Sequence, residues 1–279
     1  METMTNAEYR KKEGISSSDL KTMMKSMATW KYYKDHPEEN DSEAFLFGRA
    51  YHKLMLEPDD FDNEFIVSPK FDRRTKEGKV AYEDFLKKSE GKEVINEETY
   101  QKLLEMQIAL YNTPFVKLLI KGEHEKSFFW EDKETGIKCK CRPDSFGKVK
   151  DQYICVDLKT TNDAETDRFM KDALKFGYDI QAYHYCQGLE DAYKNPFKFI
   201  FIAQEKTAPY LVNVLEADEY FMASGKELRN TLLSKYKECL ETGIYEGYMT
   251  ENSGINSLSV PGWLRDSLTI DDEKEGEFE

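Results

Sequence analysis

The segment 141–159, CRPDSFGKVKDQYICVDLK, restricts the fold of this chain more than any other segment does. Its second half is expected to be a β-strand, in which successive side chains point to opposite faces. One face then carries Ile154, Val156 and Leu158, and the opposite face carries Cys155, Asp157 and Lys159. A carboxylate and an ammonium group, two residues apart, therefore point to the same side of the strand.

The residues before this strand predict a hairpin. HEKSFFWED, KETG and IKCKCRPD have the composition of a strand, a turn and a second strand. Pro143 ends the second strand, and Asp144 follows at its tip. If this strand pairs with the strand of Asp157, the two carboxylates converge beside the ammonium group of Lys159. Cys139 and Cys141 share one strand face and are expected to pack inward.

The remaining chain predicts helices on both sides of these strands in the sequence. Residues 1–15 look irregular, and 70–92 look like a charged loop that leads into a short helix at about 80–86. Longer helices are expected from the cap residues 16–19 to about 33, from the cap Ser42 to Pro58, at about 97–111, at 164–194 with a break near Gly177, and at about 217–242. KFIFIAQ and PYLVNVL add two strands.

This order of elements predicts an α/β fold with a mixed central β-sheet flanked by helices. We find no internal repeat and no domain boundary, so we expect one domain over residues 1–250. Its helical N-terminal part covers 16–120 and its catalytic core 121–250. Residues 251–279 then form a tail that is acidic at its end.

Composition sets limits on location and partners. The polar N-terminus has no apolar signal core, no run of about 18 apolar residues appears, and five scattered Cys suit reduced thiols, so a cytoplasmic protein without membrane contact is expected. The net charge of −14 argues against a nucleic-acid partner. However, TIDDEKEGEFE at the end contributes −5 of it (six acids, one Lys), and a metal-binding site must itself be acidic.

Two carboxylates beside an ammonium group suit phosphodiester hydrolysis. Carboxylate oxygens bind Mg²⁺, which lowers the pKa of a bound water and neutralises charge on the phosphorane. Lys159 can orient the attacking water. The alternative is that Asp157-Leu158-Lys159 lies on an ordinary solvated strand face, because such a triplet is common on strands.

Further motifs follow the same order as in a known family. Gln181 and Tyr185 lie four apart, on one face of a predicted helix. Upstream, FGRAYH and LMLEP place His52 in a G-x-x-x-H-x-x-x-L-x-P segment. Glu125 lies on the strand before the hairpin, and ISSSDL begins the first helix. From about residue 14 to 215 this ordered set resembles the PD-(D/E)XK exonucleases of the RecE and lambda-exonuclease groups, in which Q-x-x-x-Y follows the catalytic strand.

The resemblance implies a restriction-endonuclease-like core and a set of active-site roles. These roles fall on His52, Glu125, Asp144, Asp157, Lys159, Gln181 and Tyr185. Asp144 and Asp157 would bind Mg²⁺, or Mn²⁺ in its place, with His52 or Glu125 completing the shell. A Ser of the first helix, Ser16 or more specifically Ser18, would bind the 5′-phosphate of a DNA end; the alternative is that these residues only cap the helix.

The resemblance further implies a 5′-to-3′ exonuclease on double-stranded DNA ends that leaves 3′ single strands for a RecT-like annealing protein in phage or prophage recombination. It also implies a ring-shaped homo-oligomer, a trimer or tetramer. Two alternatives stay open at this point: an endonuclease with the same core, and a non-catalytic DNA- or protein-binding module. His52 could also be an ordinary buried histidine, and Glu125 an ordinary exposed strand residue.

Overall fold

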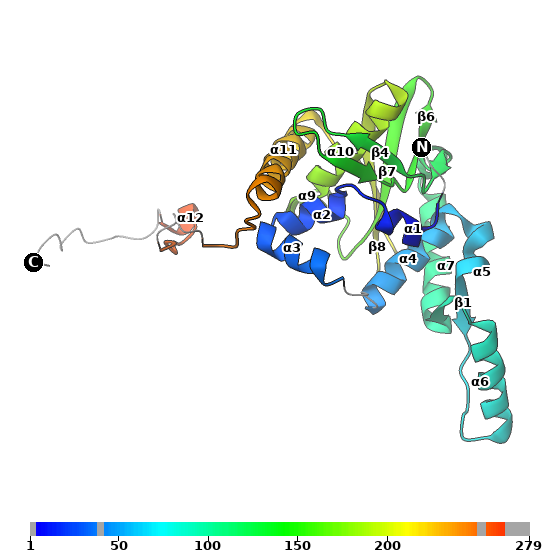
Figure 1. Cartoon of the computed structure of the whole chain (residues 1–279). Helices are drawn as coiled ribbons and strands as arrows, with labels where there is room; N and C mark the ends of the chain where they lie inside the picture. Colours follow the sequence, from blue (N-terminus) through cyan, green and yellow to red (C-terminus); the bar gives the residue numbers. More distant parts are fainter. Residues whose placement is uncertain (1–3, 38–41, 250–254, 266–279) are drawn as a thin grey trace, which may run out of the picture.

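The computed structural model describes residues 4–37, 42–249 and 255–265 (Figure 1). Its helices are α1 (Asn6–Lys11), α2 (Ser17–Met23), α3 (Met27–Asp35), α4 (Glu43–Leu56), the 3₁₀ helix η1 (Pro58–Asp60), α5 (Phe61–Glu64), α6 (Lys76–Lys88), α7 (Glu97–Asn112), α8 (Val116–Leu119), α9 (Thr166–Lys175), α10 (Tyr178–Tyr193), α11 (Glu219–Thr242) and α12 (Gly262–Arg265). Its strands are β1 (Phe65–Ser68), β2 (Glu93–Asn96), β3 (Glu123–His124), β4 (Phe128–Glu131), β5 (Lys138–Cys141), β6 (Ser145–Val149), β7 (Gln152–Thr161), β8 (Phe197–Glu205) and β9 (Val212–Glu216).

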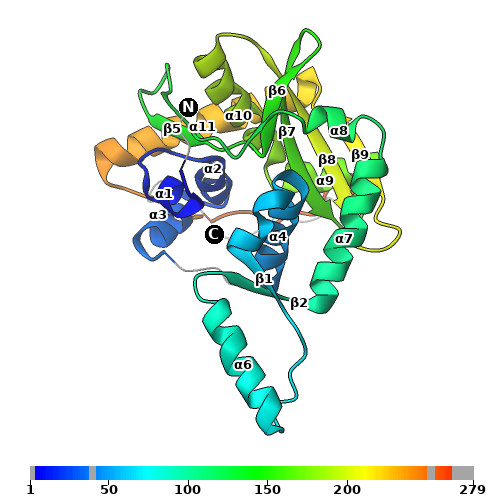
Figure 2. The ribbon, with the colours of Figure 1, turned by 90° about the vertical axis from the view of Figure 1, so that its right-hand side faces the viewer.

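The central sheet has five strands in the order β3-β6-β7-β8-β9. β7 and β8 are parallel, and the other neighbours are antiparallel, so the sheet is mixed. Helices cover both of its faces, as Figures 1 and 2 show. The predicted α/β fold with a mixed central sheet flanked by helices is therefore confirmed.

Strand β7 lies at the centre of the sheet, and its two faces contact different cores. Ile154, Val156 and Leu158 pack with buried residues of α4 and α7, whereas Cys155 packs with those of α9 and α10. The alternation predicted from the sequence is thus present. Because both faces of β7 are covered, the charged side chains near its end lie in a largely dry environment.

The hairpin prediction is correct in part and wrong in one pairing. β4 and β5 form the predicted hairpin, and Cys139 and Cys141 are buried, but this hairpin is a separate two-stranded sheet. β5 does not pair with β7 as the sequence suggested. A strand that the sequence analysis missed, β6, begins directly after Asp144 and pairs with β7 in the register Ser145 to Val156. The GKV and KDQ residues around this turn are too polar to show the usual strand alternation.

The N-terminal third differs from expectation in three places. The helix expected to run to residue 33 is two helices, because Ser26 caps α3 and its side chain accepts from the Thr29 amide at 3.0 Å. Residues 1–15 were expected to be irregular, but α1 has a capping box between Thr5 and Glu8. The charged loop contains α6, which is longer than predicted and starts at residue 76. The acidic residues 269–279 lie outside the described residues.

Residues 69–92 form an arm that projects from the body between β1 and β2, as all three figures show. The arm has its own small cluster, in which the ring of Phe71 contacts Tyr82 and Phe85. No residue of α6 is buried. The arm is therefore held by local packing and by the parallel pair β1–β2 at its base. None of the helices in the described part of the chain is both long and apolar enough to cross a bilayer.

His184, on α10, joins the hairpin to α11 through both of its ring nitrogens. Nε2 donates to the Lys140 carbonyl at 3.1 Å, and Nδ1 accepts from Arg229 Nε at 3.2 Å. A second proton, on Nδ1, would therefore point at the N–H donor of Arg229. Burial, followed by the charge of Arg229, lowers the pKa of His184 to about 3. This histidine is structural and stays neutral in the folded state.

A pH-dependent stability follows from His184. Below the ordinary histidine pKa of 6.5 the unfolded chain gains a proton that the folded chain does not bind, so stability is lost as pH falls from 6.5 toward 3. The loss is up to about 1.4 kcal/mol per pH unit. We expect His184→Gln to reduce the slope of unfolding free energy against pH over this window, measured by urea unfolding. The exposed His36→Gln is the control, and an unchanged slope for His184→Gln would contradict the assignment.

Candidate active site at the end of strands β6 and β7

Asp144 and Asp157 come together because of the register between β6 and β7. Ser145 is paired with Val156, so Asp144 and Asp157 occupy the next position along the same two strands. The Asp144 carboxylate accepts from the Leu158 amide at 2.7 Å. This hydrogen bond holds the side chain of Asp144 against β7, beside the catalytic candidates on that strand.

Asp157 is 1% exposed, and both of its oxygens have partners. Oδ2 forms an ion pair with the ammonium of Lys159, and Oδ1 accepts from the side-chain amide of Gln181. Burial, with the negative charge of Asp144, raises the pKa of Asp157 above its usual value. Burial acts to lower the pKa of Lys159, but Asp157 and Asp144 outweigh it and raise this pKa. Lys159 is therefore a cation that is tied to the carboxylates.

His52 and Glu125 approach Asp144 from the side that faces the cleft. His52 comes from α4 and lies with Nδ1 at 3.3 Å from Asp144 Oδ2. Glu125 follows β3, where its backbone has a positive φ of 49° and its amide contacts the Asp144 carbonyl at 3.3 Å. Arg142 Nε donates to Glu125 Oε2 at 2.9 Å. One ligand atom each from His52, Glu125 and Asp144 lies within 4.8 Å of the others.

The three residues of this group shift one another's pKa values. Burial acts to lower the pKa of His52, but the charge and hydrogen bond of Asp144 prevail and raise it to about 9. Burial acts to raise the pKa of Asp144, yet His52 keeps it below its usual value. Burial and the charge of Asp144 raise the pKa of Glu125 to about 7. His52 and Asp144 thus form a charged pair, and His52 would have to lose its proton to bind a metal ion.

The donor set fits a hard divalent cation. Two carboxylates and one imidazole are ligands that Mn²⁺ and Mg²⁺ accept, and opposite ligands of such an ion lie about 4 Å apart. The ligand atoms of His52, Glu125 and Asp144 all lie within 4.8 Å of one another, so they are close enough to surround one ion. Asp157 is not part of this group, because its oxygens contact Gln181 and Lys159. The predicted ligand set of four is thus divided into a cluster of three and a neighbouring carboxylate.

Gln181 and Tyr185 lie on one face of α10, as predicted, and both contact α2. Gln181 Oε1 accepts from Lys21 Nζ at 2.5 Å, and Tyr185 shares a hydrogen bond with Ser17. Ser17 and Lys21 were missed in the sequence analysis, although their spacing of four on a helix matches that of their partners. Arg142 was also missed, although it stands directly before Pro143 and Asp144.

The two serines proposed to read a DNA end have different positions. Ser16 is the N-cap of α2: its hydroxyl accepts from the Asp19 amide at 3.2 Å and donates to the Asp19 carboxylate at 2.6 Å. Ser18 is exposed on the first turn of α2. The capping role of Ser16 is therefore confirmed, and a phosphate contact of either serine stays a prediction.

A cleft of about 860 Å³ leads away from His52 and Glu125. Its wall carries four further basic side chains, namely Arg49, Lys53, Lys126 and Arg142. The cleft reaches Glu64 and Glu93, which adjoin the strands β1 and β2 at the base of the arm. The same wall also carries acidic side chains, two of which pair with Arg49 and Lys53, so the candidate site is continuous with a groove of mixed charge that ends where the arm begins.

Comparison with known proteins identifies a matching family and solved structures of similar fold. Residues 16–249 match the model of a family described as a PDDEXK-like domain of unknown function (DUF3799). A crystal structure described as "Putative exonuclease" from Eubacterium rectale superposes with a TM-score of 0.62 at 14% identity, covering 93% of this chain and 97% of that one. The crystal structure of SSO0001 (16% identity, 71% and 85% covered) reaches a TM-score of only 0.33 and carries no argument. No curated protein matches the sequence.

The ligand cluster can be tested by metal binding alone. Asp144→Asn keeps an oxygen that can accept from the Leu158 amide but removes the charge that a cation needs, so the fold should persist. We expect Mn²⁺ affinity, measured by calorimetry, to fall by at least about tenfold. Glu123→Gln, an exposed acid on β3 close to the site in sequence, is the control. Equal affinities of wild type and Asp144→Asn would exclude Asp144 as a ligand.

Proposed function

Because the chain belongs to the family of PDDEXK-like domains, we propose that it is a metal-dependent nuclease that hydrolyses DNA. One observation carries the proposal: Asp144, Asp157 and Lys159 meet at the end of β6 and β7, with His52 and Glu125 beside Asp144. The site thus combines carboxylates that can bind a metal ion with the ammonium group of Lys159, and attack on a phosphodiester requires this combination.

Each of these residues has a distinct role in the proposed reaction. His52, Glu125 and Asp144 would hold Mg²⁺ or Mn²⁺, and Asp157 would add its negative charge beside them. The ion would supply a water of lowered pKa and would neutralise charge on the phosphate. Lys159 is positioned by Asp157 and would orient the attacking water and stabilise the negative charge of the transition state. Gln181 holds the second oxygen of Asp157 and so limits its rotation.

We further propose that the substrate is a double-stranded DNA end. The name of the relative from Eubacterium rectale and the ordered motifs of the RecE and lambda-exonuclease groups support an exonuclease. The motifs also support 5′-to-3′ digestion, a role in phage or prophage recombination with a RecT-like annealing protein, and a ring of three or four copies. Ser18, exposed on the first turn of α2, is our candidate for contact with the terminal 5′-phosphate.

The distribution of charge supports a DNA substrate despite the net charge of −14. Residues 70–92, in the arm, contain eight Lys or Arg and five Asp or Glu, which gives +3. The positive charge therefore lies in the arm, whereas the wall of the cleft is of mixed charge, with Arg49 paired to Glu93 and Lys53 to Glu57. A duplex that enters the cleft and extends along the arm would meet the Lys and Arg side chains of the arm, which can bind its phosphates.

Digestion of matched DNA substrates tests the proposed function. We expect linear duplex DNA to be degraded in Mg²⁺ or Mn²⁺, and neither linear nor closed circular DNA to be degraded in chelator. Covalently closed circles should survive in metal as well, because they offer no end. Cutting of circles would favour the endonuclease alternative, and no cleavage of either form would contradict nuclease activity. Asp157→Ala, which removes a central carboxylate, should be inactive.

Lys159 should serve the reaction more than the binding of DNA. The ammonium group of Lys159 is held by Asp157 and does not lie in the wall of the cleft. Lys159→Ala should therefore lower kcat by about a hundredfold or more while DNA affinity changes little. Binding is measured in Ca²⁺ and turnover in Mg²⁺. As a control, Lys126→Ala, in the wall of the cleft, should weaken binding more than kcat. A loss of affinity without a loss of kcat in Lys159→Ala would contradict this role.

A further inference from the structure

Helix α2 contacts α10 through two matched polar pairs. Ser17 and Lys21 lie four apart on α2, and their partners Tyr185 and Gln181 lie four apart on α10. Apolar residues close the same interface, since Leu20 and Met23 pack in one cluster with Ile180. The residues of the Q-x-x-x-Y motif are therefore held from outside the catalytic strands by an N-terminal helix.

The amide of Gln181 bridges two charges of opposite sign. Its oxygen accepts from the ammonium of Lys21 at 2.5 Å, and its nitrogen donates to Oδ1 of Asp157. An amide has a donor end and an acceptor end, and rotation by 180° exchanges them. In the rotated form the oxygen would face a carboxylate and the NH₂ group would face an ammonium. The hydrogen bond donated by Lys21 Nζ therefore favours the orientation in which Gln181 donates to Asp157.

We propose that Lys21 is a positioning residue of the catalytic centre: through Gln181 it fixes the amide donor on Asp157 and thereby the orientation of that carboxylate. With Oδ1 held by Gln181 and Oδ2 held by Lys159, the plane of the Asp157 carboxylate is set relative to Asp144. This inference rests on the proposed nuclease function, which it extends to a helix outside the catalytic strands.

A ring contact and a shifted pKa place Lys21 at the centre rather than at the surface. The ammonium groups of Lys21 and Lys159 lie 4.8 and 4.9 Å from the centroid of the same ring, that of Tyr178. Burial, followed by the charge of Lys159, lowers the pKa of Lys21 to about 7. A lysine whose only role was to solvate α2 would extend into water, as the exposed Lys25 does after the same helix. Lys21 instead points inward, toward a second ammonium group.

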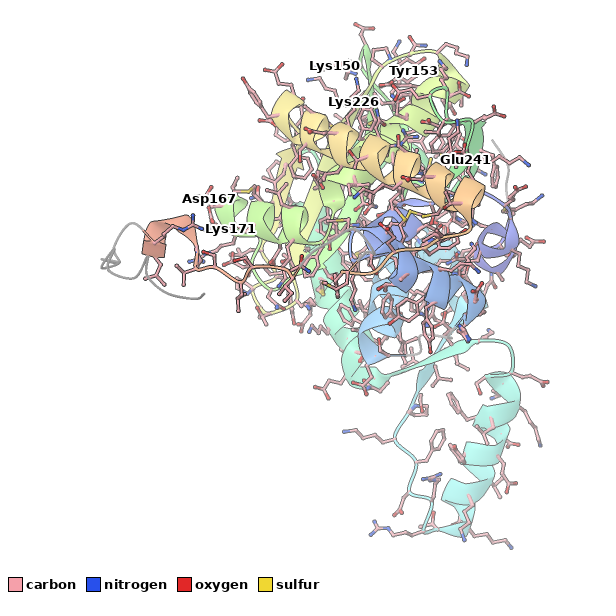
Figure 3. All side chains as sticks on the ribbon, turned by 60° about the vertical axis from the view of Figure 1, so that its left-hand side comes forward. Lys150, Tyr153, Asp167, Lys171, Lys226 and Glu241 are labelled. Atoms are coloured by element: carbon pink, nitrogen blue, oxygen red, sulfur yellow. The ribbon has the colours of Figure 1, made fainter. Side chains whose placement is uncertain are left out.

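The experiment is a double-mutant cycle between Lys21 and Gln181. Lys21→Met keeps the length of the side chain and removes its charge, and Gln181→Leu removes the bridging amide. Lys21→Arg is the conservative variant, because it keeps a cationic donor. Lys226→Met changes an exposed lysine on α11, labelled in Figure 3, and is the matched control. Each protein is assayed on linear duplex DNA in Mg²⁺ and by thermal unfolding.

We expect Lys21→Met to lower kcat by about tenfold with little change in KM, and Lys21→Arg to recover much of the loss. The double variant should be no slower than Gln181→Leu alone, because Lys21 acts through that amide. Wild-type kcat in Lys21→Met, or losses that multiply in the double variant, would overturn the proposal. A purely structural lysine would lower the melting temperature without this non-additive pattern in kcat.

The double-mutant cycle in melting temperature distinguishes a failure of this inference from a failure of the proposed function. If wild type cleaves no DNA under any metal condition, the nuclease proposal fails, but the coupling can still be measured. Melting temperatures that fall no further in the double variant than in the worse single variant support the link between Lys21 and Gln181. Independent, additive losses in melting temperature overturn it.

Discussion

Asp157 is 1% exposed near the end of the central strand, where an isolated carboxylate would cost several kcal/mol. The surrounding elements supply what this charge needs. Lys159, two residues further along β7, provides the positive charge, and Gln181 of α10 provides a hydrogen-bond donor. The neighbouring carboxylates also have partners of opposite charge, because Asp144 is paired with His52 and Glu125 with Arg142. The site is thus a set of alternating charges, in which the removal of one partner leaves another uncompensated.

This alternation explains why helices distant in sequence must meet at one end of the sheet. α4 brings His52, β3 brings Glu125, and α10 and α2 together bring the bridging amide and its ammonium partner. Gly177, with a positive φ of 66°, separates α9 from α10 and allows α10 to start against α2, where a Cβ atom would lie 2.7 Å from the Met24 sulfur. The positions of these helices are therefore set by the chemistry of the site as well as by apolar packing.

Part of this arrangement could be predicted from local patterns. The alternation along 152–159 indicated which side chains share a face with Asp157, and the spacing of Gln181 and Tyr185 indicated one helix face. Pairing between strands could not be derived in the same way. β6 is short and polar, so its existence depends on the partner β7 rather than on its own composition. The break between α2 and α3 was missed for a related reason, since the cap at Ser26 interrupts a run of residues that all favour a helix.

The sequence by itself determined the class of the fold, the strand that carries Asp157 and Lys159, and the residue types that could carry the proposed chemistry, because these depend on periodicity within single elements. Only the tertiary structure decided how the acidic residues are grouped, with His52, Glu125 and Asp144 in one cluster and Asp157 turned toward Lys159 and Gln181. It also revealed Lys21 and Arg142 as members of the site. The physical reason is that a buried charge is compensated by residues that are its neighbours in space. These residues come from elements far apart along the chain, so no periodic pattern in the sequence connects them.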